Sequence, residues 1–246
     1  MVRRAWLPCR TTARRGDAWN RRGGARRGSA GFTLEFFQTT DRTERLLQRF
    51  ELHHGAAIAR IDHFNISVND APRAYDYYES LGFRCSETIE DENRLYAAWM
   101  HRKATVHDVA MTGGASPRLH HTGFFTPEAH SILHLCDLFG AIDEQRHIER
   151  GPGRHGVSNA FYLYLRDHDG HRIEIYTSDY FTGDPDHEPY RWNVNDMRRR
   201  DFWGAAVVPS WYAESTPVLD LDGRIVPSTA IEPERSELVV GADGFR

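Results

Sequence analysis

Two histidines and one glutamate, far apart along the chain, have the clearest potential for chemistry. His63 lies in the stretch IDHFN, His121 in LHHT, and Glu174 at the centre of the strand-like run RIEIY. Two imidazoles and one carboxylate leave three faces of an octahedron open and suit non-haem Fe(II), with Mn(II) as a substitute. A solitary glutamate more often faces water. His120, beside His121, is expected to point to the opposite face of its strand and is the lesser candidate ligand.

A repeat in the chain gives a reason to expect that the three residues meet. Residues 61–83 and 119–141 each open with a short alternating run that carries a histidine, and each continues with a proline near a helix start. His63 stands 19 residues before Gly82, and His121 stands 19 residues before Gly140. Strands related by a pseudo-two-fold axis bring equivalent side chains together. The two histidines are therefore expected to converge, with Glu174 on the last strand completing the set.

The same repeat predicts the elements that must position these residues. Apolar residues at helical spacing predict one helix that starts after Asp70 or Asn69 and a second that starts after Thr126. The two glycines are expected to end them. Strand-like runs follow at residues 84–89, 96–100 and 105–111 in the first copy and at 142–148, 159–166 and 171–177 in the second. The chain thus predicts two βαβββ units between about residues 58 and 178, an α+β architecture with a curved mixed sheet around the site.

Other polar residues occur where a fold could gather them. His107 lies in the strand-like run ATVHDVA, and Arg150, Arg154 and His155 surround a glycine-rich turn. Arginine with histidine binds anions well, because a guanidinium holds a carboxylate through two parallel hydrogen bonds. The ordinary alternatives stay open: His107 could face solvent, and the glycine-rich turn and the run RRRD at residues 198–201 could be solvated basic loops.

Composition is typical of a globular protein. The chain has 246 residues, enough to bury a core, and its hydrophobic content is 40%. No apolar run approaches the roughly 20 residues of a membrane helix. Its three cysteines are far apart and form no Cys-x-x-Cys pair, which argues against a disulfide framework and favours the cytoplasm.

The N-terminal segment differs from the rest in charge. Residues 1–27 hold nine of the 31 basic residues and a single acid, so the remainder has 22 basic against 34 acidic residues, a formal charge near −12. The charge would also suit a nucleic-acid tether or an Arg-rich transit peptide, but the low apolar content favours a disordered segment at residues 1–30. We expect no nucleic-acid or membrane partner.

Residues 31–57 predict the remnant of a further module. GFTLEFF (31–37) repeats the pattern of GHRIEIY (170–176), with a glycine four residues before a glutamate and an aromatic residue two after it. The rest of that module is absent from the sequence, and a truncated or misread 5′ coding region is one hypothesis for the Arg-rich head. Residues 179–246 predict an irregular, aromatic C-terminal tail that packs over the active site.

Several long motifs resemble one enzyme family. RIDHFN, YAAWMHRKATVHD, RLHH, IERGPGRHGVSNAFYLYLRDHDGHRIEIYTSDY and VVPSWY are similar to the extradiol ring-cleaving catechol dioxygenases of the vicinal oxygen chelate superfamily, from about residue 31 to the C-terminus. The resemblance implies O2-dependent cleavage of a catechol, 3,4-dihydroxyphenylacetate above all, to a ring-opened semialdehyde by a homotetramer.

The resemblance also implies roles for individual residues. The Fe(II) ligands would be His63, His121 and Glu174, with Mn(II) as the substitute. His107 would be the acid/base, with Tyr164 and Asn65 as further catalytic groups. Substrate would be bound by Trp99, Arg150, His155 and Arg199, with Arg200 beside them.

Two other functions stay open at this point. The same fold carries metal-free binding proteins, so a ligand- or metal-binding module without catalysis is one alternative. An inactive fragment is the other, because the N-terminal module is absent from the sequence and the run that follows Asn65 departs from the family pattern.

Overall fold

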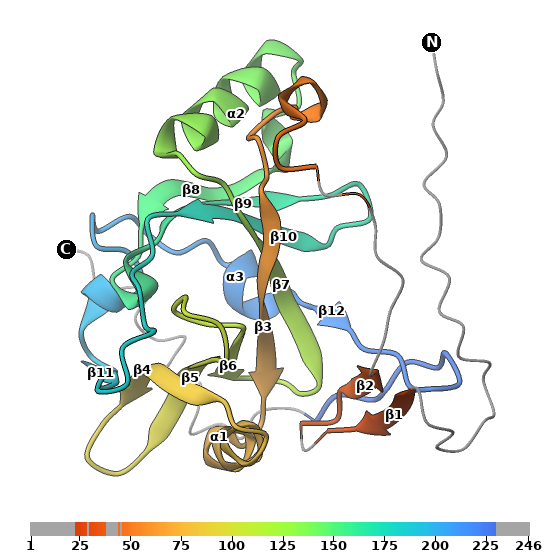
Figure 1. Ribbon diagram of the computed structural model, residues 1–246, viewed down its shortest axis with the longest axis vertical. Helices are drawn as coiled ribbons and strands as arrows, with labels where there is room; N and C mark the ends of the chain where they lie inside the picture. Colours follow the sequence, from red (N-terminus) through yellow and green to blue (C-terminus); the bar gives the residue numbers. More distant parts are fainter. Residues whose placement is uncertain (1–22, 29, 38–43, 45, 230–246) are drawn as a thin grey trace.

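The computed structural model describes residues 23–28, 30–37, 44 and 46–229 of the chain (Figure 1). Most of the segment expected to be disordered, residues 1–22, lies outside this part. In the described remainder, β1 (Gly23–Arg27) pairs antiparallel with β2 (Thr33–Phe37) as a separate two-stranded sheet.

One ten-stranded mixed sheet holds most of the described chain. Its order is β11-β4-β5-β6-β3-β7-β10-β9-β8, and β12 pairs with β7 beside this path. The strands are β3 (Arg60–Val68), β4 (Arg84–Glu90), β5 (Leu95–His101), β6 (Val109–Gly113), β7 (Arg118–Phe125), β8 (Ile148–Arg154), β9 (Phe161–Arg166), β10 (Arg172–Thr177), β11 (Tyr190–Asn193) and β12 (Thr216–Pro217).

The sheet consists of two copies of one arrangement, as the repeat predicts. In each copy the first strand runs parallel to the last, β3 to β6 and β7 to β10. The two first strands, β3 and β7, meet antiparallel at the centre of the sheet. The predicted pair of βαβββ units and the α+β class are therefore confirmed, and equivalent residues of the two copies face each other across the β3–β7 pair.

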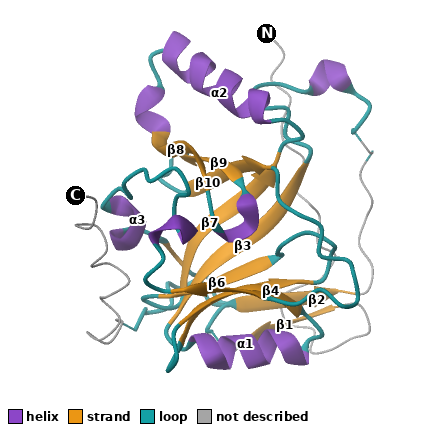
Figure 2. Ribbon diagram, turned by 90° about the vertical axis from the view of Figure 1, so that its left-hand side faces the viewer, coloured by secondary structure: helices purple, strands orange, loops and turns teal. Residues whose placement is uncertain are grey.

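The helices cover one face of the sheet, and the C-terminal segment lies on the other. Helix α1 (Ala71–Ser80) packs on the first copy and α2 (Ala129–Ala141) on the second, at opposite ends of the molecule (Figure 1). The short helix α3 (Ser210–Ala213) packs through Trp211 against Tyr164 on the other face, and Figure 2 shows it at the left, at a height between α1 and α2. Short 3-10 turns occur at Phe50–Leu52, Gln145–His147, Val157–Asn159 and Met197–Arg199. No helix in the described residues has the length and apolar content of a membrane span.

Helix α1 begins and ends where local sequence signals predict. The Asp70 carboxylate accepts a hydrogen bond from the Arg73 backbone N–H at 3.0 Å, and Pro72 lies in the first turn. Gly82 follows the helix with φ of +82°, the left-handed conformation that glycine adopts at low cost.

Helix α2 differs from the prediction at both ends. It begins at Ala129, because the Thr126 hydroxyl donates to the Ala56 carbonyl at 2.5 Å instead of capping the helix. Gly140 lies inside the helix, and the left-handed residue after it is Asp143, with φ of +60°. A tertiary contact replaced the local cap.

The prediction also starts the strand after α2 too early in the sequence. Residues 142–148 were predicted as a strand, but Ile142 is 64% exposed, Gln145–His147 form a 3-10 turn, and β8 begins only at Ile148. The strand β8 instead runs through the glycine-rich stretch that was predicted as a loop. An edge strand tolerates a proline without a ladder hydrogen bond, which is why Pro152 lies within it. In the first copy, β6 likewise begins at Val109 rather than at residue 105.

Candidate metal centre and active site

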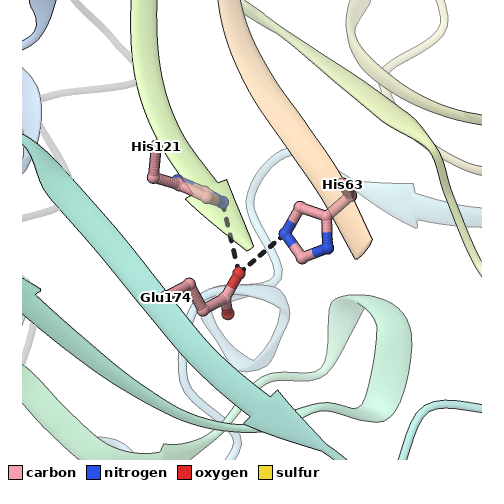
Figure 3. Close-up of side chains that lie close together, drawn as sticks. All are labelled: His63, His121 and Glu174. Carbon is pink, nitrogen blue, oxygen red and sulfur yellow. Dashed lines mark hydrogen bonds and ion pairs between the residues drawn. The ribbon is translucent and has the colours of Figure 1, made fainter. Parts of the chain in front are cut away.

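Three neighbouring strands bring His63, His121 and Glu174 together. In the pairing of β3, β7 and β10, Gly123 of β7 lies opposite His63 on one side and opposite Glu174 on the other. His121 precedes Gly123 by two residues, so its side chain leaves the same face of β7. Figure 3 shows the three side chains pointing toward one another from their separate strands.

The donor atoms of this group lie within reach of a single ion. Glu174 Oε2 is 2.9 Å from His63 Nε2 and 3.2 Å from His121 Nε2, and one ligand atom of each residue lies within 4.8 Å of the others. All three residues are buried, with exposed fractions of 3% or less. Two buried imidazole nitrogens and one buried carboxylate fit a divalent metal such as Fe(II) or Mn(II).

Gly123 makes room for this arrangement. A Cβ atom at this position would overlap the His63 ring, whose Cε1, Nε2 and Nδ1 atoms all lie over the Gly123 backbone. The imidazole can therefore reach across β7 toward Glu174 only because the residue between them has no side chain.

Burial and mutual contact shift the pKa of each ligand; for His63, burial lowers the pKa, but the contacts with Asp62 and Glu174 outweigh it and raise the pKa above its usual value. Burial alone would raise the pKa of Glu174, but hydrogen bonds from His121 and His63 outweigh it and hold the pKa well below its usual range. Burial also lowers the pKa of His121 to about 4, against the opposing effect of Glu174. The site thus presents an ionised carboxylate beside a neutral imidazole, the forms in which these groups bind metals.

The three ligands lie at the side of a pocket of about 280 Å³. His63 is buried behind the pocket wall, and every other residue to which the resemblance assigns a role lines the pocket, whereas Arg154 does not. These residues are Asn65, Trp99, His107, His121, Arg150, His155, Tyr164, Glu174, Arg199 and Arg200.

His107 lies against the metal-ligand group. Its ring centroid is 3.9 Å from that of His63, and its Nδ1 has no hydrogen-bond partner among the described residues. Burial lowers the pKa of His107 well below its usual value, and the neighbouring His63 adds to this effect. His107 is therefore a neutral imidazole that can accept a proton.

Tyr164 and His155 form a short hydrogen-bonded chain in the pocket. His155 Nδ1 lies 2.6 Å from the Arg200 carbonyl oxygen, which only accepts, so Nδ1 carries the proton and donates. His155 Nε2 then accepts from the Tyr164 hydroxyl at 2.9 Å. Burial raises the pKa of Tyr164 well above its usual value, so this hydroxyl stays a donor.

The arginines form the polar end of the pocket. Arg150 donates to the Arg200 carbonyl oxygen at 2.9 Å, and its guanidinium carbon lies 4.6 Å from the Trp211 ring centre. Arg199 is 5% exposed and donates through Nε and Nη2 to the Val194 carbonyl oxygen, so only its remaining donors are available to a ligand.

Two residues near the site, Trp211 and Asp62, were not predicted as part of it, and His120 was named only as the lesser candidate ligand. Trp211 lines the pocket, and its ring centroid lies 4.5 Å from that of Tyr164. The signal for it was the motif VVPSWY, whose aromatic residues were assigned only to a covering tail. Asp62 contacts the ligand His63, and His120 contacts the ligand His121. His120 does not point away from His121, contrary to the expectation from strand alternation, because the strand is irregular at this residue.

Two βαβββ units that share one three-ligand site define a class of two-repeat metalloproteins. Residues 60–175 match the family model of the Glyoxalase/Bleomycin resistance protein/Dioxygenase superfamily. The chain is similar to the solved structure of homoprotocatechuate 2,3-dioxygenase from Arthrobacter globiformis, with 52% identity and a TM-score of 0.81 over 85% of this chain and 70% of that one. The chain belongs to the extradiol dioxygenases of this superfamily.

Two further relatives support the same assignment. A variant of homoprotocatechuate 2,3-dioxygenase from B. fuscum has 51% identity and a TM-score of 0.81, over 86% of this chain and 63% of that one. A manganese-dependent 2,3-dihydroxybiphenyl 1,2-dioxygenase from Geobacillus genomosp. 3 is 34% identical over 157 residues, 61% of this chain and 49% of that protein. The chain therefore spans about half the length of this curated relative.

Proposed function

We propose that this chain is a divalent-metal-dependent dioxygenase that cleaves a catechol ring outside its two hydroxyl groups. The observation that carries the proposal is the convergence of His63, His121 and Glu174 beside a pocket that also holds an imidazole and a phenol. Fe(II) is the proposed metal, with Mn(II) as a substitute. A divalent ion held there supplies open coordination positions for the catechol oxygens and O2, and a route for electrons from the ring to O2.

His107 acts as the acid/base of the reaction in this proposal. Because burial keeps its imidazole neutral, it can take a proton when a catechol hydroxyl ionises and return a proton later. Tyr164 lines the same pocket and donates its one proton to His155 Nε2, so its oxygen can accept a hydrogen bond from a hydroxyl of the catechol. His155 accepts from Tyr164 and fixes the direction of that hydroxyl. Asn65, which accepts from Thr112 at 3.1 Å, and Trp99 complete the pocket wall.

The proposed substrate is 3,4-dihydroxyphenylacetate, the catechol acted on by enzymes to which this chain is similar. Its acetate group would lie among Arg150, Arg199 and Arg200, where a guanidinium can hold a carboxylate, with His155 beside them. We further propose that the protein acts in the cytoplasm as a homotetramer, without a nucleic-acid partner. Light scattering would test the assembly by comparing its mass with the 28.3 kDa of one chain.

The decisive experiment is oxygen uptake by the purified chain after loading with Fe(II) or Mn(II). With 3,4-dihydroxyphenylacetate we expect one O2 consumed per ring and a yellow ring-opened semialdehyde. Binding of the catechol without O2 uptake would favour the non-catalytic binding module. A chain that neither folds nor binds metal would favour the inactive fragment.

The anion pocket has its own test in Arg199→Ala. Loss of a charged hydrogen bond should raise KM for 3,4-dihydroxyphenylacetate by about 10- to 100-fold, while KM for plain catechol changes little. Plain catechol is the control, since Arg199 also donates to the Val194 carbonyl and its loss could disturb the fold. Equal losses for both substrates would remove Arg199 from the anion pocket.

A further inference from the structure

Each of the two histidine ligands is preceded by a residue that interrupts the β3–β7 pairing. Ile61 pairs with Phe124 and His63 with Gly123, so Asp62 has no partner on β7. Asn65 pairs with His121 and Ile66 with Leu119, so His120 has no partner on β3. Such an extra residue is a β-bulge, and it breaks the alternation of side chains between the two faces. The bulges occupy equivalent positions in the two repeats.

The bulges place two consecutive side chains on the same face. Asp62 and His63 are both buried, whereas Ile61 and Phe64 on either side are 60% and 46% exposed. His120 and His121 are likewise both buried, at 9% and 3%. In each repeat, the residue before the ligand can therefore touch the ligand's ring.

Asp62 contacts the ring nitrogen of His63 that does not face the metal site. Its Oδ2 lies 3.2 Å from His63 Nδ1, while His63 Nε2 faces Glu174. Its Oδ1 accepts from Arg60 at 3.0 Å and lies 3.7 Å from Lys103 Nζ, so two cations lie against this buried carboxylate. A metal bound at His63 Nε2 would leave the proton of the neutral ring on Nδ1, where the Asp62 oxygen can accept it.

His120 fixes His121 in the same way through a different chemistry. His120 Nε2 lies 3.0 Å from the Trp211 carbonyl oxygen, which only accepts, so this nitrogen carries a proton. In neutral His120 the other nitrogen, Nδ1, is then an acceptor, and it lies 2.7 Å from His121 Nδ1. His121 Nε2 faces Glu174, so a metal bound at Nε2 would leave the His121 proton on Nδ1, where His120 can accept it.

We propose that Asp62 and His120 are positioning residues that set the tautomer and ring orientation of the two histidine ligands. The inference rests on the proposed metal site, and it adds an asymmetry between the repeats. His63 Nδ1 contacts the Asp62 carboxylate, which makes His63 Nε2 the stronger electron-pair donor to a cation. His121 Nδ1 contacts the His120 ring, which in turn contacts the Trp211 carbonyl oxygen. This chain of contacts connects the metal site to the C-terminal segment that lines the substrate pocket.

The role of Asp62 is tested by metal binding to Asp62→Ala and Asp62→Asn. We expect Asp62→Ala to weaken Mn(II) binding, measured by chelator competition, by about 10- to 100-fold. Asp62→Asn should recover part of the loss, because the amide oxygen can still accept from His63. The matched control is Asp108→Asn, which removes a carboxylate that also pairs with Lys103, at 2.7 Å, and is expected to leave the affinity unchanged.

The role of His120 is tested by two variants that each keep one of its hydrogen bonds. In His120→Asn the amide oxygen can replace Nδ1 and accept from His121, and in His120→Gln the amide nitrogen can replace Nε2 and donate to Trp211. We expect His120→Gln to weaken Mn(II) binding by about tenfold and His120→Asn to keep it. We expect His120→Asn instead to weaken anaerobic binding of 3,4-dihydroxyphenylacetate to the Mn(II)-loaded protein by about fivefold, the cost of one hydrogen bond.

Absorption of the Co(II)-loaded protein in the visible range gives a readout that loss of fold alone would not produce. Its bands should shift in Asp62→Ala and His120→Gln and stay in place in Asp108→Asn. A wild-type chain that binds no metal would overturn the proposed function, and the inference with it. A wild-type chain that binds Mn(II) no better than Asp62→Ala and His120→Gln would overturn the inference alone.

Discussion

At the scale of single residues, His107 is the buried polar group of the pocket whose unpaired nitrogen costs folding free energy. His107 is 6% exposed, and its Nδ1 has no hydrogen-bond partner among the described residues. An unpaired buried polar atom costs about 1–3 kcal/mol, so such an atom beside a ligand site calls for a function. Acceptance of a substrate proton is the function that fits its neutral state and its place against His63.

The change His107→Phe tests that function. It keeps a ring of similar size beside His63 but removes both nitrogens, and it should lower kcat for 3,4-dihydroxyphenylacetate by about 10²- to 10⁴-fold. Metal content, measured by atomic absorption, should stay at the wild-type value because His107 is not one of the three ligands. Wild-type turnover in this variant would exclude the acid/base role.

At the scale of elements, the site depends on how closely neighbouring strands approach. His63 reaches Glu174 across β7, and Gly123 is the residue that this path crosses. In the first repeat, Glu87 of β4 connects three segments that are distant in the sequence. It accepts from the Ser158 N–H and the Trp192 indole, both at 2.7 Å, and from the Tyr180 hydroxyl. Ser158, with φ of +62°, belongs to the turn that follows His155.

Gly123→Ala should damage the metal site while the same change at another glycine should not. The added methyl group overlaps the His63 ring, so we expect Mn(II) affinity to fall by at least tenfold, measured by chelator competition. Gly140→Ala in α2 is the control, because a Cβ there meets nothing within 4 Å and alanine favours a helix interior by about 0.5–1 kcal/mol. Equal metal affinity in both variants would contradict the steric role of Gly123.

Glu87 gives the fold a dependence on pH. Burial raises the pKa of Glu87 to about 7 despite hydrogen bonds from Tyr180, Trp192 and Ser158, whereas an exposed glutamate has a pKa of about 4.5. The folded state therefore holds this proton more tightly than the unfolded state. The resulting stability is fully present below about pH 4.5 and is lost as the pH rises through about 7.

The change Glu87→Gln should remove this dependence. Between pH 5.5 and pH 8 the wild-type free energy of unfolding should fall by about 2 kcal/mol more than that of the variant, as measured by urea denaturation at each pH. Glu87→Gln should be less stable at every pH, because its amide N–H groups cannot accept from the Trp192 indole. Parallel pH profiles for the two proteins would contradict the assignment.

At the scale of the whole molecule, the metal site joins the two repeats. His63 comes from the first repeat, and His121 and Glu174 come from the second, so one ion would bridge the β3–β7 junction at the centre of the sheet. A ligand that binds only the folded state stabilises it by about 2.7 kcal/mol at a hundred times its dissociation constant.

Metal removal should therefore lower the melting temperature of the whole chain. For a protein of this size we expect a fall of about 5–10 °C when Mn(II) is exchanged for a chelator, measured by calorimetry. The variant Glu174→Gln, which keeps the shape of the side chain but loses its charge, should show little response to the metal. A shift of equal size in Glu174→Gln would place the stabilising ion elsewhere.

Local sequence signals were sufficient wherever the structure is locally determined. The N-cap Asp70 and the glycine after α1 were predicted because cap and helix are adjacent in the chain. The cap of α2 was wrong because Thr126 donates to Ala56, a residue 70 positions away that no local pattern reveals. The start of β8 was missed because its neighbour β9, rather than its own alternation, decides where the strand begins.

The sequence by itself determined which residue types could form the site and that two repeats would carry them, because equal spacing of the first-strand histidine and the glycine is a property of the chain alone. Only the tertiary structure decided that Asp62 and His120 share a face with the ligands and that Gly123 must lack a side chain. Both depend on the pairing of β3 with β7. A register between two strands exists only once residues some 60 positions apart have met, so no stretch of sequence can specify it alone.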